Sequence, residues 1–233
     1  MRPGALAAAF LFTGALAVLL MMREADWSPL IIHGGLMIFA WIILAPLCVL
    51  IARFLKVMPG QDFPQIKDNP FWWRWHWIGQ SVAVAISTAG FAAIVIAKGG
   101  AMPATTHGAL GLCIVIAGWL QIIGGLLRGS KGGPTDARAD PARPETWRGD
   151  HYDMTLRRRI FEGAHKAAGY GAVLLAPVAA WQGLELAGIE RLVSVSTQCF
   201  TATIAIAFIA GEWAGWRVPT WRAIWGDEPP GRV

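Results

Sequence analysis

The sequence predicts an all-α integral membrane protein built as a six-helix bundle. Of its 233 residues, 55% are hydrophobic and only 15% are charged, whereas a soluble domain carries about 25% charged residues. The charges cluster in short segments, and the apolar runs between them match the ~20 residues that a helix needs to cross a bilayer. One such run can be a buried core helix, but a soluble domain of this size has no means of surrounding several in succession.

Six segments have the length and apolarity of a membrane span. They run over residues 4–22, 29–55, 71–97, 105–127, 159–184 and 192–213. We interpret residues 1–23 as a first transmembrane helix; a secretory signal peptide is the alternative, although no small-residue cleavage pattern precedes Arg23. Residues 24–215 form the predicted transmembrane core, and residues 216–233 form a cytoplasmic tail.

The basic residues predict the orientation of these spans. With the N-terminus in the cytoplasm, sixteen of the 20 Lys and Arg residues lie on the cytoplasmic side, and only Arg23, Lys98 and Arg191 lie outside. The positive-inside rule therefore predicts a plasma- or inner-membrane protein with both termini in the cytoplasm. Because topology accounts for the net charge of +5, nucleic acid is not predicted as a partner. The basic loop 129–157 is predicted to be flexible and largely disordered, with membrane lipid as a secondary contact.

Four of the five histidines lie a few residues inside successive spans, where an ionisable side chain indicates function. His33 and His107 lie near the outer face on spans of one direction, and His76 and His165 lie near the cytoplasmic face on spans of the other. Two neutral imidazoles can fill both axial positions of a haem iron. The pattern predicts two non-covalent b-type haems with two histidines each, since zinc usually takes three or four protein ligands. A hydrogen bond to a neighbouring helix is the alternative for any single histidine.

Glycine follows each of these histidines within four positions. The glycines are Gly34, Gly35, Gly79, Gly111 and Gly169. Residues three or four apart share one face of a helix, so we predict that these glycines, Gly111 and Gly169 among them, leave room for a porphyrin beside the ligands.

The residues around the histidines form motifs in a specific order. The motifs are His33-Gly34-Gly35-Leu36-Met37 with Ala40-Trp41, Pro46 and Ala52-Arg53-Phe54; Trp75-His76-Trp77 with Gln80; His107-Gly108-Ala109-Leu110-Gly111 with Gln121, Gly124 and Arg128; and Arg159, Phe161-Glu162, His165 and Gly169-Tyr170. Over about residues 25–215 the chain thereby resembles the eukaryotic-type cytochrome b561 family, in the form of the core domain that is fused to other redox modules.

This resemblance implies a bundle whose central four helices hold two haems b, with His33 opposite His107 and His76 opposite His165. It also implies electron transfer from a cytoplasmic donor, often ascorbate, to an external acceptor such as ferric iron or monodehydroascorbate. Ascorbate-using members carry an Arg-containing signature at the cytoplasmic end of the second span, and residues 49–54 match that signature only in part.

Basic and amide side chains supply further candidates. Arg53 and Arg74, with Lys56, cluster at the cytoplasmic end, where they would neutralise haem propionates or attract an anionic reductant; anchoring by the positive-inside rule explains them equally well. Gln80 and Gln121 are expected to form hydrogen bonds across the bundle. His151, in the loop 129–157, is predicted to be solvated.

These observations predict transmembrane electron transfer through two bis-histidine haems, from a cytoplasmic donor to an extracytoplasmic acceptor, as in a ferric or monodehydroascorbate reductase. The donor is a small molecule or a quinol, and the acceptor is a small molecule or a redox partner protein. A quinone-linked haem b subunit of a larger complex and a haem-free transporter are the alternatives. A homodimer is left open, and no catalytic nucleophile or acid–base pair is predicted.

Overall fold

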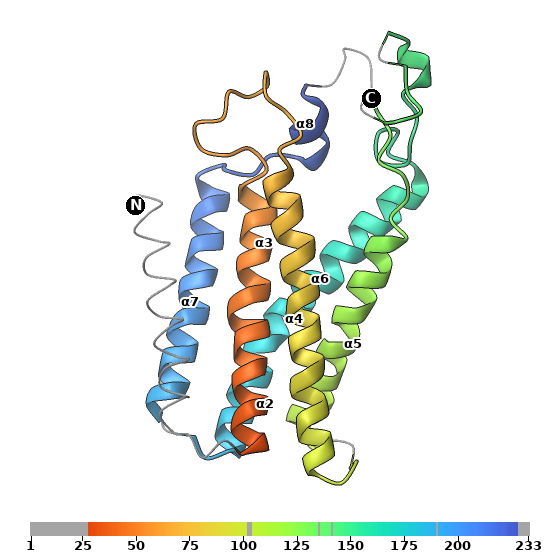
Figure 1. Ribbon diagram of the computed structural model, residues 1–233. Helices are drawn as coiled ribbons and strands as arrows, with labels where there is room; N and C mark the ends of the chain where they lie inside the picture. Colours follow the sequence, from red (N-terminus) through yellow and green to blue (C-terminus); the bar gives the residue numbers. More distant parts are fainter. Residues whose placement is uncertain (1–27, 102–103, 135, 141, 190, 228–233) are drawn as a thin grey trace.

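The computed structural model describes residues 28–101, 104–134, 136–140, 142–189 and 191–227 (Figure 1). Five helical segments in these ranges are long and apolar enough to cross a membrane, which makes the chain an integral membrane protein. They are Pro29–Phe54, Pro70–Ala97, Thr106–Leu126, Leu156–Leu186 and Arg191–Trp213. Each end lies within three residues of the predicted end. The predicted span 4–22 lies outside the described residues.

Polar side chains begin four of these helices. The oxygen of an N-cap side chain accepts a backbone N–H that has no partner inside the helix. The caps are Ser28 before α2 (Pro29–Met37), Asn69 before α4 (Pro70–Ala97), Thr105 before α5 (Thr106–Leu126) and Thr155 before α6 (Leu156–Leu186). Proline follows the first two of these caps, and its fixed φ suits the first helical turn. The local sequence therefore determines where these spans begin.

The first described span changes its helical geometry in the middle. Between α2 and α3 (Ala45–Phe54) lies a π-helical segment, η1 (Ile38–Leu44). Trp41 at its centre is only 7% exposed. Its indole packs against Gly118 of α5 so closely that a Cβ at that glycine would lie 3.2 Å from the ring. The wider turns of the π-helix and the absence of a side chain at Gly118 therefore accommodate Trp41 in the middle of the bundle.

The core consists of residues from the α2–η1–α3 span together with α4, α5, α6 and α7 (Arg191–Trp213). α2 and α3 pack along α4, α5 packs along α6, and α6 also contacts η1. α7 contacts α3, η1 and α6, and its Val193, Phe200 and Ile204 are part of the buried core. Small residues allow the close approach, since Ala40, Ala45 and Ala83 are completely buried. Large apolar side chains such as Leu120 and Leu174 point outward, as expected for a surface that faces lipid.

The loops at one end of the bundle carry nine of the 17 Lys and Arg residues in the described ranges, and we call this the basic end. It comprises residues 55–69, the described residues between 127 and 155, and residues 214–227, and the last of these include the short helix α8 (Thr220–Trp225) (top of Figure 1). The loops hold one another together: Lys131 pairs with Asp68, and the backbone N–H of Asp68 donates to the Ala223 carbonyl.

The prediction that residues 129–157 are largely disordered is wrong for the described part of this loop. Its two ends are joined by hydrogen bonds from the backbone N–H of His151 to the Ser130 carbonyl and of Tyr152 to the Lys131 carbonyl. Tyr152 is 6% exposed and packs on Trp221 and Trp225 of α8, with ring centres 5.9 and 5.3 Å away. A few aromatic contacts with the C-terminal segment order the loop, and average composition does not reveal such contacts.

His151 also differs from its prediction as a solvated residue. It is 5% exposed, and its ring lies 4.9 Å from the Trp225 ring. Burial, reinforced by repulsion from Arg158, lowers the pKa of His151 to about 4. The residue is therefore a neutral part of the loop packing at physiological pH.

Candidate functional site

The four transmembrane histidines lie in two facing pairs. His33 on α2 faces His107 on α5 at the end opposite the basic end, with ring centres 6.1 Å apart and ring planes at 87°. His76 on α4 faces His165 on α6 near the basic end, with ring centres 6.1 Å apart and planes at 76°. The structure therefore brings together the residues that the sequence placed at equal depths on spans of the same direction.

The distance between the rings suits one metal ion held between each pair. An imidazole nitrogen binds a transition metal at about 2 Å, which places the ring centre about 3 Å from the metal. Two rings on opposite sides of one iron then have centres about 6 Å apart, in agreement with 6.1 Å in both pairs. Within the described ranges no group of three or more His, Cys, Asp or Glu side chains could hold a metal ion. Two axial ligands with the equatorial positions left free fit a porphyrin.

Three of the four rings are oriented by a backbone carbonyl of a neighbouring helix. The Nδ1 atoms of His33 and His107 lie 2.9 Å from the Gly90 oxygen and 2.8 Å from the Ala179 oxygen. The Nδ1 atom of His76 lies 3.4 Å from the Cys48 oxygen. A carbonyl accepts only from a protonated Nδ1, so Nε2 keeps its lone pair and is free to bind a metal.

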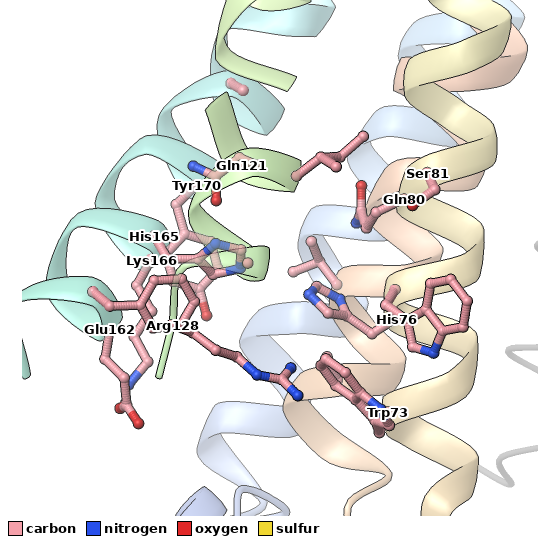
Figure 2. A pocket seen from close by; sticks show the side chains of 18 of the residues that line it. Trp73, His76, Gln80, Ser81, Gln121, Arg128, Glu162, His165, Lys166 and Tyr170 are labelled. Atoms are coloured by element: carbon pink, nitrogen blue, oxygen red, sulfur yellow. The ribbon is translucent and has the colours of Figure 1, made fainter. Parts of the chain in front are cut away.

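The pair near the basic end adjoins a cavity of about 560 Å³. This volume lies within the ~300–1,000 Å³ of pockets that bind organic ligands. The cavity reaches from the basic-end loops to the middle of the bundle, where Trp41 and Gly118 line it. Figure 2 shows His76 and His165 projecting from opposite sides, α4 and α6, with Arg128 extending toward Trp73. The space and the two facing histidines together fit a haem on this side of the bundle.

Basic side chains dominate the charged lining of this cavity. They are Arg53, Lys56, Arg128, Arg158 and Lys166, and Glu162 is the acidic residue among the lining side chains. One oxygen of Glu162 accepts from Nε of Arg158 at 3.0 Å, and the other accepts from Nζ of Lys166 at 2.9 Å. Lys56 and Arg128 have no ion-pair partner within the described part of the chain, so the cavity carries excess positive charge. Anionic groups such as haem propionates suit this lining.

Lys56 is unusually buried for a lysine, at 8% exposure. Its ammonium group donates to the Val218 carbonyl at 3.0 Å and lies over the Trp72 ring. Burial, with repulsion from Arg53 and Lys166, lowers the pKa of Lys56 to about 8. Its positive charge is therefore present at neutral pH and is lost in mildly alkaline solution.

The two arginines predicted to bind the cofactor occupy different surroundings. Arg53 lines the cavity, but its guanidinium donates to both oxygens of Glu212 on α7, at 2.6 and 3.0 Å. Arg74 is exposed and is not among the residues that line the cavity. Arg53 thus connects the site to α7, and the structure does not bring Arg74 to it.

The glycines divide into two groups. A Cβ at Gly35 or Gly111 would meet nothing within 4 Å, and Gly169 lines the cavity, so these positions do leave open space. Gly79 is different, because a Cβ there would collide with Sγ of Cys48. Gly79 therefore allows α3 and α4 to pack closely and does not provide room for a cofactor.

Two charge arrangements of the site were missed in the sequence. Arg158, Glu162 and Lys166 are spaced at four residues, which puts them on one face of α6 beside His165. Glu212 is an acidic residue within an otherwise apolar span, a position that indicates a partner. The four-residue spacing and the intramembrane acid were both detectable signals, but the sequence alone does not show that Glu212 meets Arg53, which is 159 residues away.

The chain is similar to a much longer plant protein. Over 166 residues, 71% of the chain, it is 27% identical to a "cytochrome b561, DM13 and DOMON domain-containing protein" of Arabidopsis thaliana. The chain covers 16% of the length of that relative. No family model matches the chain. This distant similarity points to a cytochrome b561-like membrane domain, in agreement with the resemblance of the histidine motifs.

Proposed function

We propose that this protein transfers electrons across a membrane through two b-type haems. His33 and His107 would hold one haem, and His76 and His165 would hold the other. The observation that carries the proposal is the pair of equal ring distances, 6.1 Å, at two depths of one membrane bundle. A single buried histidine has many explanations, whereas two facing pairs at the spacing of a bis-imidazole iron have few.

A bound haem would supply an iron that takes up and releases one electron, and the residues of the chain would determine the position of that iron in the bundle. Two histidines at each iron would leave no coordination site for a substrate, which favours electron transfer over chemistry at the iron. The carbonyls of Gly90, Ala179 and Cys48 orient three ligand rings. The basic lining around Lys56 and Arg128 would hold the propionates of the haem near the basic end.

The basic end is the proposed entry side for electrons. The predicted topology puts this end in the cytoplasm, and the cavity beside His76 and His165 opens among its loops. A small donor would approach there, and the acceptor would be reduced at the opposite end near His33 and His107. The plant relative is named for DM13 and DOMON domains as well, so a redox partner protein on the outer side is part of the proposal.

The spectrum of the purified protein tests the proposal first. Protein expressed with adequate haem should show a Soret band and two haems per chain, with no free coordination site for carbon monoxide. Protein without any haem absorbance would contradict the proposal and favour the haem-free transporter.

Vesicles test the direction and the donor. With an acceptor such as ferricyanide inside and the basic end facing outward, ascorbate added outside should reduce the trapped acceptor. Reduction by a quinol alone would instead favour the quinone-linked membrane subunit. Failure of both donors in protein that holds two haems would contradict electron transfer across the bundle.

A further inference from the structure

His165 differs from the other three facing histidines in the surroundings of its second ring nitrogen. Nδ1 of His33, His76 and His107 each lies within 3.4 Å of a carbonyl oxygen on an adjacent helix. Nδ1 of His165 is out of contact with solvent and has no hydrogen-bond partner among the described residues. A buried donor without a partner is destabilising, so the site calls for an acceptor near this atom.

Gln121 provides a buried acceptor that also has no partner. Its Oε1 atom is shielded from solvent and receives no hydrogen bond within the described part of the chain. Gln121 is on α5, which packs along α6, and both residues line the same cavity. A Cβ at Gly169, one turn beyond His165, would lie 3.9 Å from Oε1 of Gln121. Figure 2 shows the carboxamide and the His165 ring on the same side of the cavity.

The carboxylate one turn before His165 on α6 is already engaged. The carboxylate of Glu162 accepts from Arg158 and Lys166. Phe161 lies against the ring, with centres 5.1 Å apart and planes at 34°. The side chain of Gln121 has rotatable bonds, so its unpaired oxygen can turn toward the unpaired Nδ1 atom on the packed neighbouring helix.

We propose that Gln121 is the positioning residue of His165, with its carboxamide oxygen accepting the Nδ1 proton of that ring. This inference rests on the proposed function, in which His165 binds haem iron through Nε2. Gln121 would then do for His165 what a carbonyl of an adjacent helix does for the other three ligands. An acceptor at Nδ1 fixes the tautomer and makes the ligand more basic, which stabilises ferric over ferrous iron.

The side-chain acceptor of Gln121 can be removed by substitution, whereas a backbone carbonyl cannot. Gln121→Leu removes the acceptor at nearly constant volume, and Gln121→Glu, measured at pH 8, strengthens it. Gln80→Leu is the matched control, because Gln80 lines the same cavity but its Nε2 donates to the Ala45 carbonyl at 2.9 Å. Haem content and the two midpoint potentials are measured by spectroelectrochemical titration, and His33→Ala identifies the potential of the haem near the basic end.

Gln121→Leu should raise the midpoint potential of the basic-end haem, by about a tenfold change in the ferric–ferrous equilibrium, which is 59 mV for one electron. Gln121→Glu should lower it, and Gln80→Leu should change it much less. The other haem should keep its potential in all three variants. Equal shifts in Gln121→Leu and Gln80→Leu, or an unchanged potential, would overturn the assignment.

Two further outcomes separate this inference from the proposed function. If Gln121→Leu loses the basic-end haem, the Gln121→Glu variant tests the assignment instead. A basic-end haem that is retained with a lowered midpoint potential supports the assignment, and an unchanged midpoint potential overturns it. If the unaltered protein binds no haem, the proposed function and this inference both fail. Two haems in the unaltered protein, with potentials insensitive to Gln121, overturn the inference alone.

Discussion

Both rings of the His33–His107 pair are held by backbone carbonyls, whereas near the basic end only His76 has such a partner. The surroundings differ as well. At the first pair the backbone of α6 packs closely against a histidine ring, since a Cβ at Gly183 would lie 2.7 Å from the His107 ring. The second pair adjoins the cavity of about 560 Å³ with its basic lining. The same ring spacing thus occurs in a closely packed site at one end and beside an open basic cavity at the other.

This difference suits two different tasks in the proposed electron path. Near the basic end, a cavity with excess positive charge would attract the proposed anionic donor, and side chains such as Arg128 contribute to the local charge. At the opposite end, the orientation of His33 and His107 depends on backbone carbonyls, which substitution of side chains changes little. We expect the basic-end site to be the more sensitive of the two to pH and to mutation of charged residues.

Removing one ligand of each pair should have the largest effect. His76→Ala should reduce the haem content from two to one per chain and abolish reduction by a donor at the basic end. His33→Ala should also leave one haem, but that haem should still accept electrons from the same donor. Haem per chain is measured by the pyridine haemochrome assay and reduction by stopped-flow absorbance. Two haems retained in either variant would show that the pairs are wrong.

Acidification should destabilise the basic end more than the rest of the bundle. The pKa of His151 is about 4 in the folded loop, against about 6.5 in an unfolded chain. The unfolded state therefore binds the extra proton between pH 6.5 and 4, so stability is lost as the pH falls through this range, by roughly 3 kcal/mol. His151→Leu should lack this dependence, as measured by thermal unfolding in detergent from pH 7 to 4. Parallel curves for the two proteins would exclude His151 as the cause.

Adding a methyl group beside His107 should affect only the site opposite the basic end. Gly183→Ala places a Cβ 2.7 Å from the His107 ring, and overpacking of this kind costs about 1–3 kcal/mol. We expect a lower occupancy or an altered spectrum of that haem, with the other haem unchanged. Gly171→Ala on the same helix is the control, since a Cβ there meets nothing within 4 Å. Equal effects of the two substitutions would contradict the close packing at His107.

The smallest effect concerns the connection of Arg53 to α7. Arg53 and Glu212 are each about a quarter exposed, so solvent screening limits their interaction to about 1 kcal/mol. In a double-mutant cycle of thermal stability, Arg53→Ala and Glu212→Ala should each destabilise, and the double variant should cost less than the sum of both. If the two destabilisations are additive, Arg53 and Glu212 do not interact, and the charge of Arg53 is available to the cavity.

Much of the fold follows from local sequence. Apolar runs of bilayer length predicted five described spans to within three residues, because a membrane requires each span to satisfy its own backbone hydrogen bonds. Caps such as Ser28 and Asn69 determine helix starts for the same local reason. Depth and direction of the spans also anticipated that His33 would lie opposite His107 and His76 opposite His165.

Only the tertiary structure decided how the side chains around these pairs are used. Gly79 accommodates Cys48, Arg53 pairs with Glu212, and His151 is buried under α8. Each of these outcomes depends on a residue from a distant part of the chain or on the packing of two helices. Periodicity and composition describe one segment at a time, and so they determine which face of a helix a residue occupies but not which residue it meets there.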